Sequence, residues 1–202
     1  MNWRTTILCL LLTLVLLLLP LQGTRRTGGE ENRFLDFIST SAETASVPEP
    51  IAPYEELLRQ SAEKLGWDWR LLASVIYHES RFNNDVQSTK GATGLMQIHS
   101  TRYSEDTLRI PAVNLSIGTN YLKMLDQMFD AAGPVDGLQF TLAAFNMGDG
   151  KMRRLIAKAD STGLDATRWE EVSTLLPKGH HTVSYVDKVL ETFDQYSSSL
   201  PR

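Results

Sequence analysis

The chain has 202 residues, of which 42% are hydrophobic and 22% are charged. This is the composition of an ordinary globular protein with a real core, and it excludes a largely disordered chain. The formal net charge is −4, with 20 basic and 24 acidic side chains. These charges are well mixed and form no basic stripe with interleaved aromatic residues, so we expect no nucleic-acid partner.

Residues 1–23 predict export from the cytoplasm. Arg4 precedes an apolar run over residues 7–21. A basic residue before an apolar run of this length is typical of a secretory signal, whereas a full membrane span takes about 20 apolar residues. Leu21 stands where a small residue is expected if a cut follows Gly23, so membrane attachment through an uncleaved anchor stays open as the alternative. In both cases we expect the folded part in the periplasm.

Residues 24–53 predict a flexible linker, because they are polar and rich in Thr, Gly, Glu, Ser and Pro. Only the apolar patch at residues 34–38 interrupts this composition. The globular domain is then expected over residues 54–202. Cys9 is the single cysteine and lies in the export segment, so we expect neither a disulfide nor a cysteine metal cluster in this domain.

From residue 54 onward the apolar residues recur with a helical period, without strand-like alternation or internal repeats. The expected fold class is therefore mainly α. Pro111 suits a first helical turn, Gly148 suits a helix end, and Thr182 is predicted to cap the last helix. The pattern predicts helices over residues 54–65, 68–81, 111–131, 137–147, 150–160 and 182–196.

The second of these helices places a carboxylate on an apolar face. Leu72, Val75 and Ile76 form an inward stripe, and Glu79 continues it at the same spacing. Glu79 also lies in the last turn, where desolvation and the negative end of the helix dipole both favour its protonated form. We therefore expect a raised pKa, which a general acid requires. A structural glutamate paired with Arg81 or another cation at the helix end is the alternative that the stripe alone leaves open.

Four short segments, one of which contains Glu79, follow one another in a characteristic order. They are residues 77–82, residues 91–98, residues 143–148 and Tyr185-Val186. Between the second and the third segment lie Asn114-Leu115, Gly118 and Tyr121-Leu122. Each is weakly specific alone, but together, at compatible spacing, they resemble the soluble lytic transglycosylase family, whose fold is related to goose-type lysozyme. The resemblance covers nearly the whole globular part.

The resemblance implies a compact, lysozyme-like helical domain whose partner is the peptidoglycan glycan strand. It makes Glu79 the catalytic acid that later acts as a base, and it makes Tyr185 the residue that orients this carboxylate. Ser80 would lie near an acetamido group of the sugar, whereas core packing is the alternative for Leu95 and Met96. The implied substrate-binding residues are Ser80, Gly94, Leu95, Met96, Gln97, Phe145 and Asn146.

Two positions depart from the family pattern. Phe145 stands where the family usually has tyrosine, so the hydrogen bond of that hydroxyl is absent. A glycan-binding module without catalysis is the alternative function that this change favours, while Glu79 and Tyr185 argue against it. His99-Ser100 stands where the family usually has Met-Pro, which affects a turn more than the chemistry.

The motifs carry a single acid, whereas typical glycosidases use two acids about 5–10 Å apart. Asp85 and Glu105 lie in polar stretches where a solvated surface role is expected. The resemblance implies that the muramic-acid C6 hydroxyl attacks C1 to give a 1,6-anhydro product, with no cofactor. A lysozyme-like hydrolase that uses a loop acid to activate water is the alternative.

Metal chemistry is a further alternative that the residues disfavour. His78-Glu79 begins like the His-Glu-x-x-His motif of zinc proteases, but Phe82 occupies the place of the second histidine. His99, His180 and His181 lie too far along the chain to restore that local pair. We therefore expect no metal site.

Overall fold

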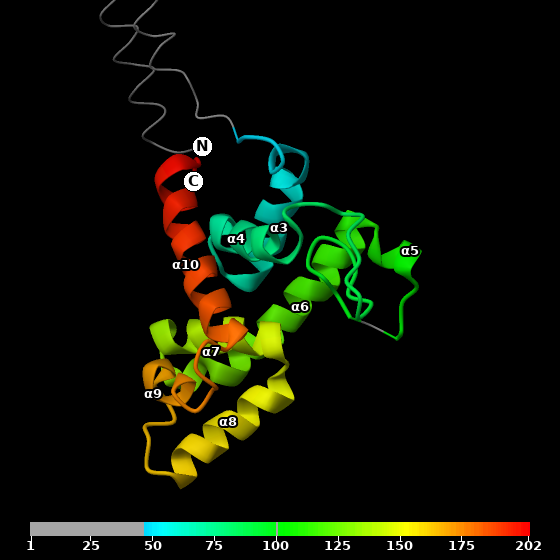
Figure 1. Ribbon diagram of the computed structural model, residues 1–202. Coiled ribbons are helices and arrows are strands. Elements are labelled where there is room, and N and C mark those ends of the chain that lie inside the picture. Colours follow the sequence, from blue (N-terminus) through cyan, green and yellow to red (C-terminus); the bar gives the residue numbers. More distant parts are fainter. Residues whose placement is uncertain (1–46, 100) are drawn as a thin grey trace, which may run out of the picture. The chain divides into compact units, whose positions relative to one another are not determined.

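The computed structural model describes residues 47–99 and 101–202, which belong to one compact unit, Ala45–Arg202 (Figure 1). Within these ranges the fold is mainly α, as predicted, and β-structure is limited to isolated bridges. Two 3-10 helices, Ala52–Tyr54 and Asp130–Ala132, supplement the α-helices. These are α3 (Glu55–Leu65), α4 (Trp69–Ser80), α5 (Glu105–Leu108), α6 (Pro111–Phe129), α7 (Pro134–Met147), α8 (Asp149–Ser161), α9 (Trp169–Ser173) and α10 (His181–Ser199).

The predicted export segment and the first 23 residues of the predicted linker lie outside the described residues. The last residues of that linker are part of the domain, because Ile51 is only 2% exposed and packs in the core. A 3-10 helix over Ala52–Tyr54 then leads into α3. None of the helices described here is long and apolar enough to span a bilayer.

All six helices predicted from periodicity are present, with ends that differ by up to a few residues. The sequence missed α5 and α9, because four and five residues are too few to show a helical period. The predicted cap at Thr182 is wrong. Helix α10 begins one residue earlier, and Nδ1 of His180 accepts a hydrogen bond from the Thr182 amide at 3.3 Å. The helix therefore starts on an imidazole cap rather than a hydroxyl cap.

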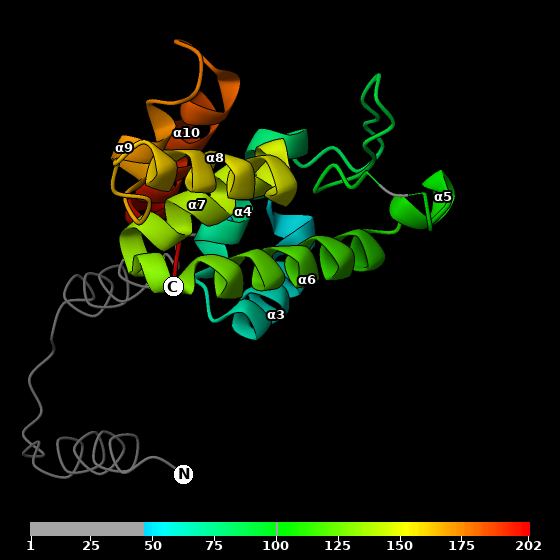
Figure 2. The same cartoon turned by 90° about the horizontal axis from the view of Figure 1, so that it is seen from below.

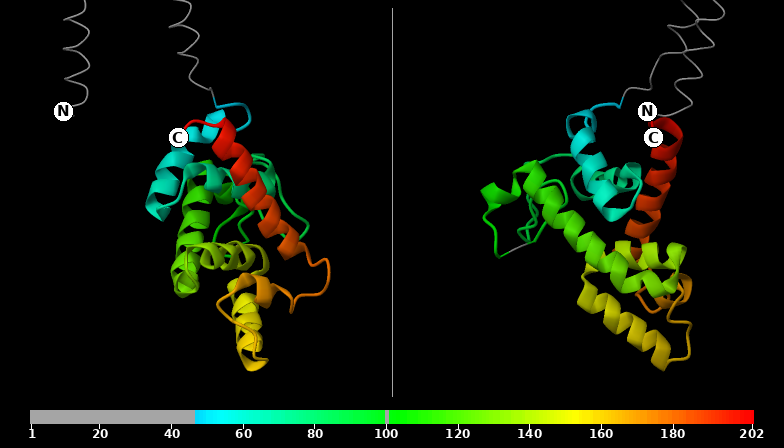
Figure 3. Two further views of the ribbon diagram at one scale, coloured as in Figure 1. Left: turned by 90° about the vertical axis from the view of Figure 1, so that its left-hand side faces the viewer. Right: turned by 180° about the vertical axis from the view of Figure 1, so that it is seen from behind.

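Helices α4, α6, α7 and α10 enclose the core. Helix α10 packs against both α4 and α7, while α6 packs against α3 and α7 (Figure 1). The segment between α4 and α6, which includes α5, stands out to one side of the helices in the view of Figure 2 and again in Figure 3. Fully buried core side chains of these four helices include Leu72, Val75, Ile76, Leu115, Leu122, Leu125, Leu142, Val186 and Val189.

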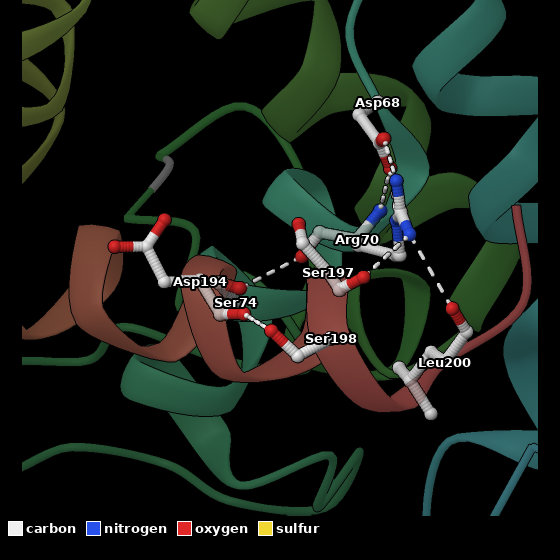
Figure 4. A network of polar contacts seen from close by, with 7 residues as sticks. All are labelled: Asp68, Arg70, Ser74, Asp194, Ser197, Ser198 and Leu200. Carbon is white, nitrogen blue, oxygen red and sulfur yellow. Dashed lines mark hydrogen bonds and ion pairs between the residues drawn. The ribbon is translucent and has the colours of Figure 1, made fainter.

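A buried arginine holds the end of α10 against the start of α4. Arg70 is 5% exposed, and its Nη1 donates to the carbonyl oxygens of Ser197 and Leu200 at 3.2 and 3.3 Å (Figure 4). Its Nε and Nη2 donate to the two carboxylate oxygens of Asp68. This hydrogen-bonded pair lowers the pKa of Asp68, and the buried guanidinium is compensated by charge and by carbonyl oxygens.

A second polar contact joins the same two helices nearer the other end of α4. The Nε2 atom of His78 lies 2.8 Å from the hydroxyl oxygen of Thr192 on α10. Burial is the largest cause of the lowered pKa of His78, so the neutral imidazole is favoured in this contact. The two contacts fix α10 along α4, and these are the helices that carry Tyr185 and Glu79.

Candidate active site

Glu79 and Tyr185 meet between α4 and α10. The Tyr185 hydroxyl donates a hydrogen bond to Oε1 of Glu79 at 2.7 Å, although the two residues are 106 positions apart. Burial raises the pKa of Glu79 to about 7, and the hydrogen bond from Tyr185 opposes this rise. The pKa of Tyr185 itself is raised well above its ordinary value, first by burial and then by the nearby Glu79 charge. The predicted rise in the pKa of Glu79 is confirmed.

The structural alternative for Glu79 was an ion pair with Arg81. Instead, the Arg81 guanidinium lies over the ring of Tyr77, 4.1 Å from its centroid. Among the described residues Glu79 has no ion pair, and its one side-chain hydrogen bond comes from Tyr185. A half-buried carboxylate without a cation keeps its proton more readily than a paired one.

The backbone turns sharply directly after the acid. Arg81 and Phe82 have φ values of 55° and 60°, in the left-handed region that non-glycine residues rarely adopt. Two such residues cost about 1–3 kcal/mol each. The buried Phe82 side chain, which stacks on Tyr54 with ring centroids 6.3 Å apart, helps to hold this turn. Helix α4 therefore ends at Ser80, and Glu79 stays in its last turn.

A cavity of about 640 Å³ opens beside Glu79. It is bounded by the end of α4, by the chain over residues 88–99, by α6 and by the end of α7. Among the predicted substrate-binding residues, Gln97, Phe145 and Asn146 line it. The full lining comprises Glu79, Ser88, Lys90, Ala92, Gln97, Ile98, His99, Ile117, Tyr121, Phe145 and Asn146.

One buried asparagine fixes the turn that forms a wall of this cavity. Asn114, on α6, is 0% exposed, and its Oδ1 accepts from the Met96 amide at 2.8 Å. Its Nδ2 donates to the carbonyl oxygens of Thr93 and Leu108 at 2.9 and 2.8 Å. The sequence marked Asn114 only as a position shared with the family. The structure shows that it positions the turn over residues 93–97.

Gly94 stands at the tightest point of this turn, with φ of +80°. A Cβ atom there would lie 2.3 Å from Nδ2 of Asn114 and 2.6 Å from the Leu108 carbonyl oxygen. We expect Gly94→Ala to lower the free energy of unfolding by about 3 kcal/mol or more, through backbone strain and overpacking. Urea unfolding measures this loss.

Gly91→Ala is the matched control, because Gly91 has φ of +83° and a Cβ atom added there would meet nothing within 4 Å. Backbone strain alone should cost this control variant about 1–2 kcal/mol. Equal losses for the two variants would show that the contact with Asn114 is unimportant.

Leu95 and Met96 are both 0% exposed and do not line the cavity. Core packing, the alternative left open for them, is what the structure shows. The Met96 side chain packs against α6, where a Cβ at Gly118 would lie 2.3 Å from its sulfur atom. The small residue at position 118 therefore makes room for Met96.

Ser80 and Gln97 both direct side-chain hydrogen bonds to backbone atoms. The Ser80 hydroxyl is buried, donates to the Ile76 carbonyl oxygen at 3.4 Å, and does not line the cavity. In Gln97, Nε2 donates to the carbonyl oxygens of Val86 and Gly94 at 3.2 and 3.1 Å. Over the described ranges the Oε1 atom of Gln97 accepts no hydrogen bond, so it is available as an acceptor in the cavity wall.

The opposite part of the wall comes from α6 and α7. Asn146 Oδ1 accepts a hydrogen bond from the Thr182 hydroxyl at 2.8 Å, which satisfies one of the partners that this amide needs. The Phe145 ring lies 5.9 Å from the Tyr121 ring, centroid to centroid. The Tyr121 hydroxyl in turn lies 3.4 Å from Oδ1 of Asp149. The ring of Phe145 thus packs on Tyr121 at the position where the family pattern has a tyrosine with a hydroxyl group.

Some lining residues were not proposed from the sequence, namely Ser88, Lys90, Ala92, Ile98, His99, Ile117 and Tyr121. Two of them could have been found from the sequence. Lys90 directly precedes the glycine-rich segment, and His99 departs from the family pattern. Asp85 and Glu105, the candidates for a second acid, are exposed and do not line the cavity. Over the described ranges no three His, Cys, Asp or Glu side chains group closely enough to hold a metal ion.

Residues 56–166 match the family model of the transglycosylase SLT domain. The chain therefore belongs to this family, as the sequence motifs predicted. It is 30% identical over 163 residues to the membrane-bound lytic murein transglycosylase F of Desulfosudis oleivorans, covering 70% of this chain and 36% of that protein. The corresponding protein of Maricaulis maris is 28% identical, covering 77% and 39%. The chain thus spans about a third of the length of these relatives.

Solved structures share the fold. The 70 kDa soluble lytic transglycosylase from Escherichia coli aligns with a TM-score of 0.59 and 27% identity, over 74% of this chain and 24% of that one. An inactive mutant of the lytic transglycosylase Slt from Pseudomonas aeruginosa aligns with a TM-score of 0.57 and 24% identity, over 83% and 28%. The domain therefore has the helical fold found in these two enzymes.

Proposed function

We propose that this domain is a peptidoglycan lytic transglycosylase. It cleaves the β-1,4 bond between N-acetylmuramic acid and N-acetylglucosamine and leaves a 1,6-anhydro end on the muramic acid. The observation that carries the proposal is Glu79, whose pKa is raised to about 7 and which lines a cavity of about 640 Å³. The family supports it, since several relatives are named lytic murein transglycosylases.

The proposed reaction uses one carboxyl group twice. Protonated Glu79 donates its proton to the glycosidic oxygen while the bond from that oxygen to C1 of muramic acid breaks. The resulting carboxylate accepts the proton of the C6 hydroxyl as O6 bonds to C1, which restores the acid and consumes no water. A pKa of about 7 suits both steps of the reaction, because the Glu79 carboxyl group can then donate and accept a proton near neutral pH.

Tyr185 serves the second half of this cycle. Its hydroxyl donates to Oε1 of Glu79 at 2.7 Å, and such a bond is stronger when the acceptor is ionised. Burial favours the acid form before cleavage, whereas the hydrogen bond from Tyr185 favours the carboxylate after it. The tyrosine is thus proposed to orient the carboxylate and to limit the rise of its pKa.

The number of acids in the cavity favours this reaction over a lysozyme-like hydrolysis. Glu79 is the one Asp or Glu side chain among the residues that line the cavity in the described part of the chain. Asp149 lies behind the wall, where it contacts Tyr121 and pairs with Arg153 at 3.0 Å. The nucleophile is therefore assigned to the substrate's own hydroxyl rather than to a water activated by a second acid.

The mass of the released fragments tests the proposal. Purified domain incubated with murein sacculi should release muropeptides that are lighter by one water molecule than those released by a hydrolase. Fragments with the mass of hydrolysis products would overturn the transglycosylase assignment in favour of a lysozyme-like enzyme. Release of neither product, with glycan still bound, would identify a silent glycan-binding module.

We also propose that residues 1–23 export the chain and that the polar stretch after them tethers the domain. The apolar run at residues 7–21 supports this, and so does the description of the relatives as membrane-bound. The mass of the mature protein distinguishes a removed signal from a retained anchor.

A further inference from the structure

Helices α4 and α10 meet at three polar contacts, which occur in opposite order along the two helices. Near the end of α4, Glu79 accepts a hydrogen bond from Tyr185 at 2.7 Å. The neighbouring residue, His78, lies 2.8 Å from the hydroxyl oxygen of Thr192. At the start of α4, Arg70 holds the last turn of α10. The helices therefore run antiparallel, and the first two contacts use adjacent residues of α4.

The contact between His78 and Thr192 spans the part of α10 that follows Tyr185. Thr192 comes seven positions after Tyr185, which is about two helical turns, so both residues lie on the same face of α10. Val186 and Val189 lie between them in the sequence and are fully buried. Apolar packing is non-directional, whereas a hydrogen bond weakens steeply when its angle changes. The hydrogen bonds therefore define the register of α10 on α4 more sharply than the valines do.

The imidazole of His78 is held from more than one side. Thr192 is only 7% exposed, and the half-buried His78 ring packs edge-on against the Tyr77 ring with centroids 5.2 Å apart. His78 also forms a hydrogen bond with the backbone of Lys188, one turn before Thr192. His78 therefore contacts two successive turns of α10, and it does so one residue before the acid.

The contact stays uncharged at and above neutral pH. The charged groups that act on the imidazole are Arg81 at the end of α4 and Lys188 and Glu191 on α10. Burial is the largest cause of the lowered pKa of His78, followed by the charge of Arg81, while the hydrogen bond with Lys188 opposes it. An ordinary histidine titrates near pH 6.5, so at and above pH 7 His78 is mainly neutral.

Given the proposed function, on which this inference rests, we infer that His78 and Thr192 are positioning residues for the reaction. Their hydrogen bond holds α10 in the register that brings the Tyr185 hydroxyl to Oε1 of Glu79. Neither residue lines the cavity, so they act on the substrate only through Tyr185 and Glu79. Removing their contact should therefore alter the acid and leave the binding of the glycan strand unchanged.

Two variants at position 192 provide the first test, with soluble glycan strands as the substrate. Thr192→Val keeps the shape of the side chain and removes its hydroxyl group. It should lower kcat about fivefold, the factor that one net hydrogen bond corresponds to, and leave KM unchanged. Thr192→Ser retains a hydroxyl group and should keep the wild-type kcat.

The pH profile gives a readout that a merely structural residue would not change. The hydrogen bond from Tyr185 lowers the pKa of Glu79, so a weaker bond lets this pKa rise. Since kcat/KM reports the acid in the free enzyme, its fall on the alkaline side should move to higher pH in Thr192→Val. Tyr185→Phe removes the bond altogether and should give the largest shift in the same direction.

Combining the two substitutions tests whether Thr192 acts through Tyr185. In the Tyr185→Phe background, Thr192→Val should cause little further loss of kcat, because the bond that it positions is already absent. The matched control is Thr119→Val. Thr119 is 5% exposed, and its hydroxyl donates to the Leu115 carbonyl oxygen at 2.6 Å within α6. This control should keep the wild-type kcat and pH profile.

The outcomes separate this inference from the proposed function. If Thr192→Val keeps the wild-type kcat and alkaline limb, or if its full loss of kcat persists in the Tyr185→Phe background, the inference is overturned and the function stands. If the wild-type protein releases no anhydro product, the proposed function fails. The pKa of Glu79 then decides, measured by NMR of carboxyl-labelled glutamate with Glu79→Gln for assignment. A pKa that Thr192→Val leaves unchanged would overturn the inference.

Discussion

Glu79→Gln is expected to lower the release of fragments from murein sacculi by about a thousandfold, within the range usual for a general acid. Glutamine keeps the shape of the side chain, and its carbonyl oxygen can still accept the hydrogen bond from Tyr185. It cannot transfer a proton to the glycosidic oxygen, nor take one from the C6 hydroxyl. The measurement is the initial rate of soluble muropeptide release at neutral pH.

Glu63→Gln is the matched control for this loss, because Glu63 is an exposed glutamate on α3 and does not line the cavity beside Glu79. It should retain the full rate. Glu79→Gln should still bind strands, because no contact of the cavity wall other than the acid is changed. A rate within about tenfold of wild type would show that another group supplies the proton, and the assignment of Glu79 would be wrong.

Glu79→Gln should also make the protein more stable than the wild type above neutral pH. The pKa of Glu79 is about 7 in the folded chain and near 4.5 when unfolded, so the folded state binds the proton more tightly. Its contribution to stability is fully present below about pH 4.5 and is lost as the pH rises through about 7. Glutamine stays neutral and avoids this loss. The expected gain at pH 8 is about 2–3 kcal/mol, after allowance for the partial exposure of Glu79.

Urea unfolding of both proteins between pH 4 and pH 9 measures this difference. The two free energies should be close at the acid end and should diverge over the interval between the two pKa values. Glu63→Gln should follow the wild-type curve throughout. Parallel curves for Glu79→Gln and wild type would mean that the folded pKa is ordinary. Loss of activity together with a gain in stability is the pattern expected where a protein keeps a destabilising group for its chemistry.

Much of the fold could be predicted because the longer helices each present an apolar stripe. Val186 and Val189 of α10 are fully buried, as the period of the sequence indicated. The short helices α5 and α9 were not predicted, because a single helical turn shows no period. The predicted cap at Thr182 was wrong, because the imidazole of His180 caps the helix instead. Ile51 belongs to the core although its neighbours in the sequence look like linker, since burial of one side chain leaves no periodic signal.

Some features of the candidate site could also be predicted from the sequence, whereas others depend on contacts between distant parts of the chain. The raised pKa of Glu79 followed from its helix position, and Tyr185 followed from the family pattern. The three hydrogen bonds that join Asn114 to separate points of the chain could not be predicted, because they depend on how α6 meets the turn over residues 93–97.

The burial of Glu79 links its raised pKa to the completion of folding. In an unfolded chain Glu79 has an ordinary pKa and is ionised at neutral pH, so it has no proton to give. Burial in the folded domain raises this pKa, and there Tyr185 of α10 donates its hydrogen bond to the carboxyl group while Arg70 holds the last turn of α10 against α4. Under the proposed function, we therefore expect a chain that has not yet folded to leave any glycan that it meets uncleaved.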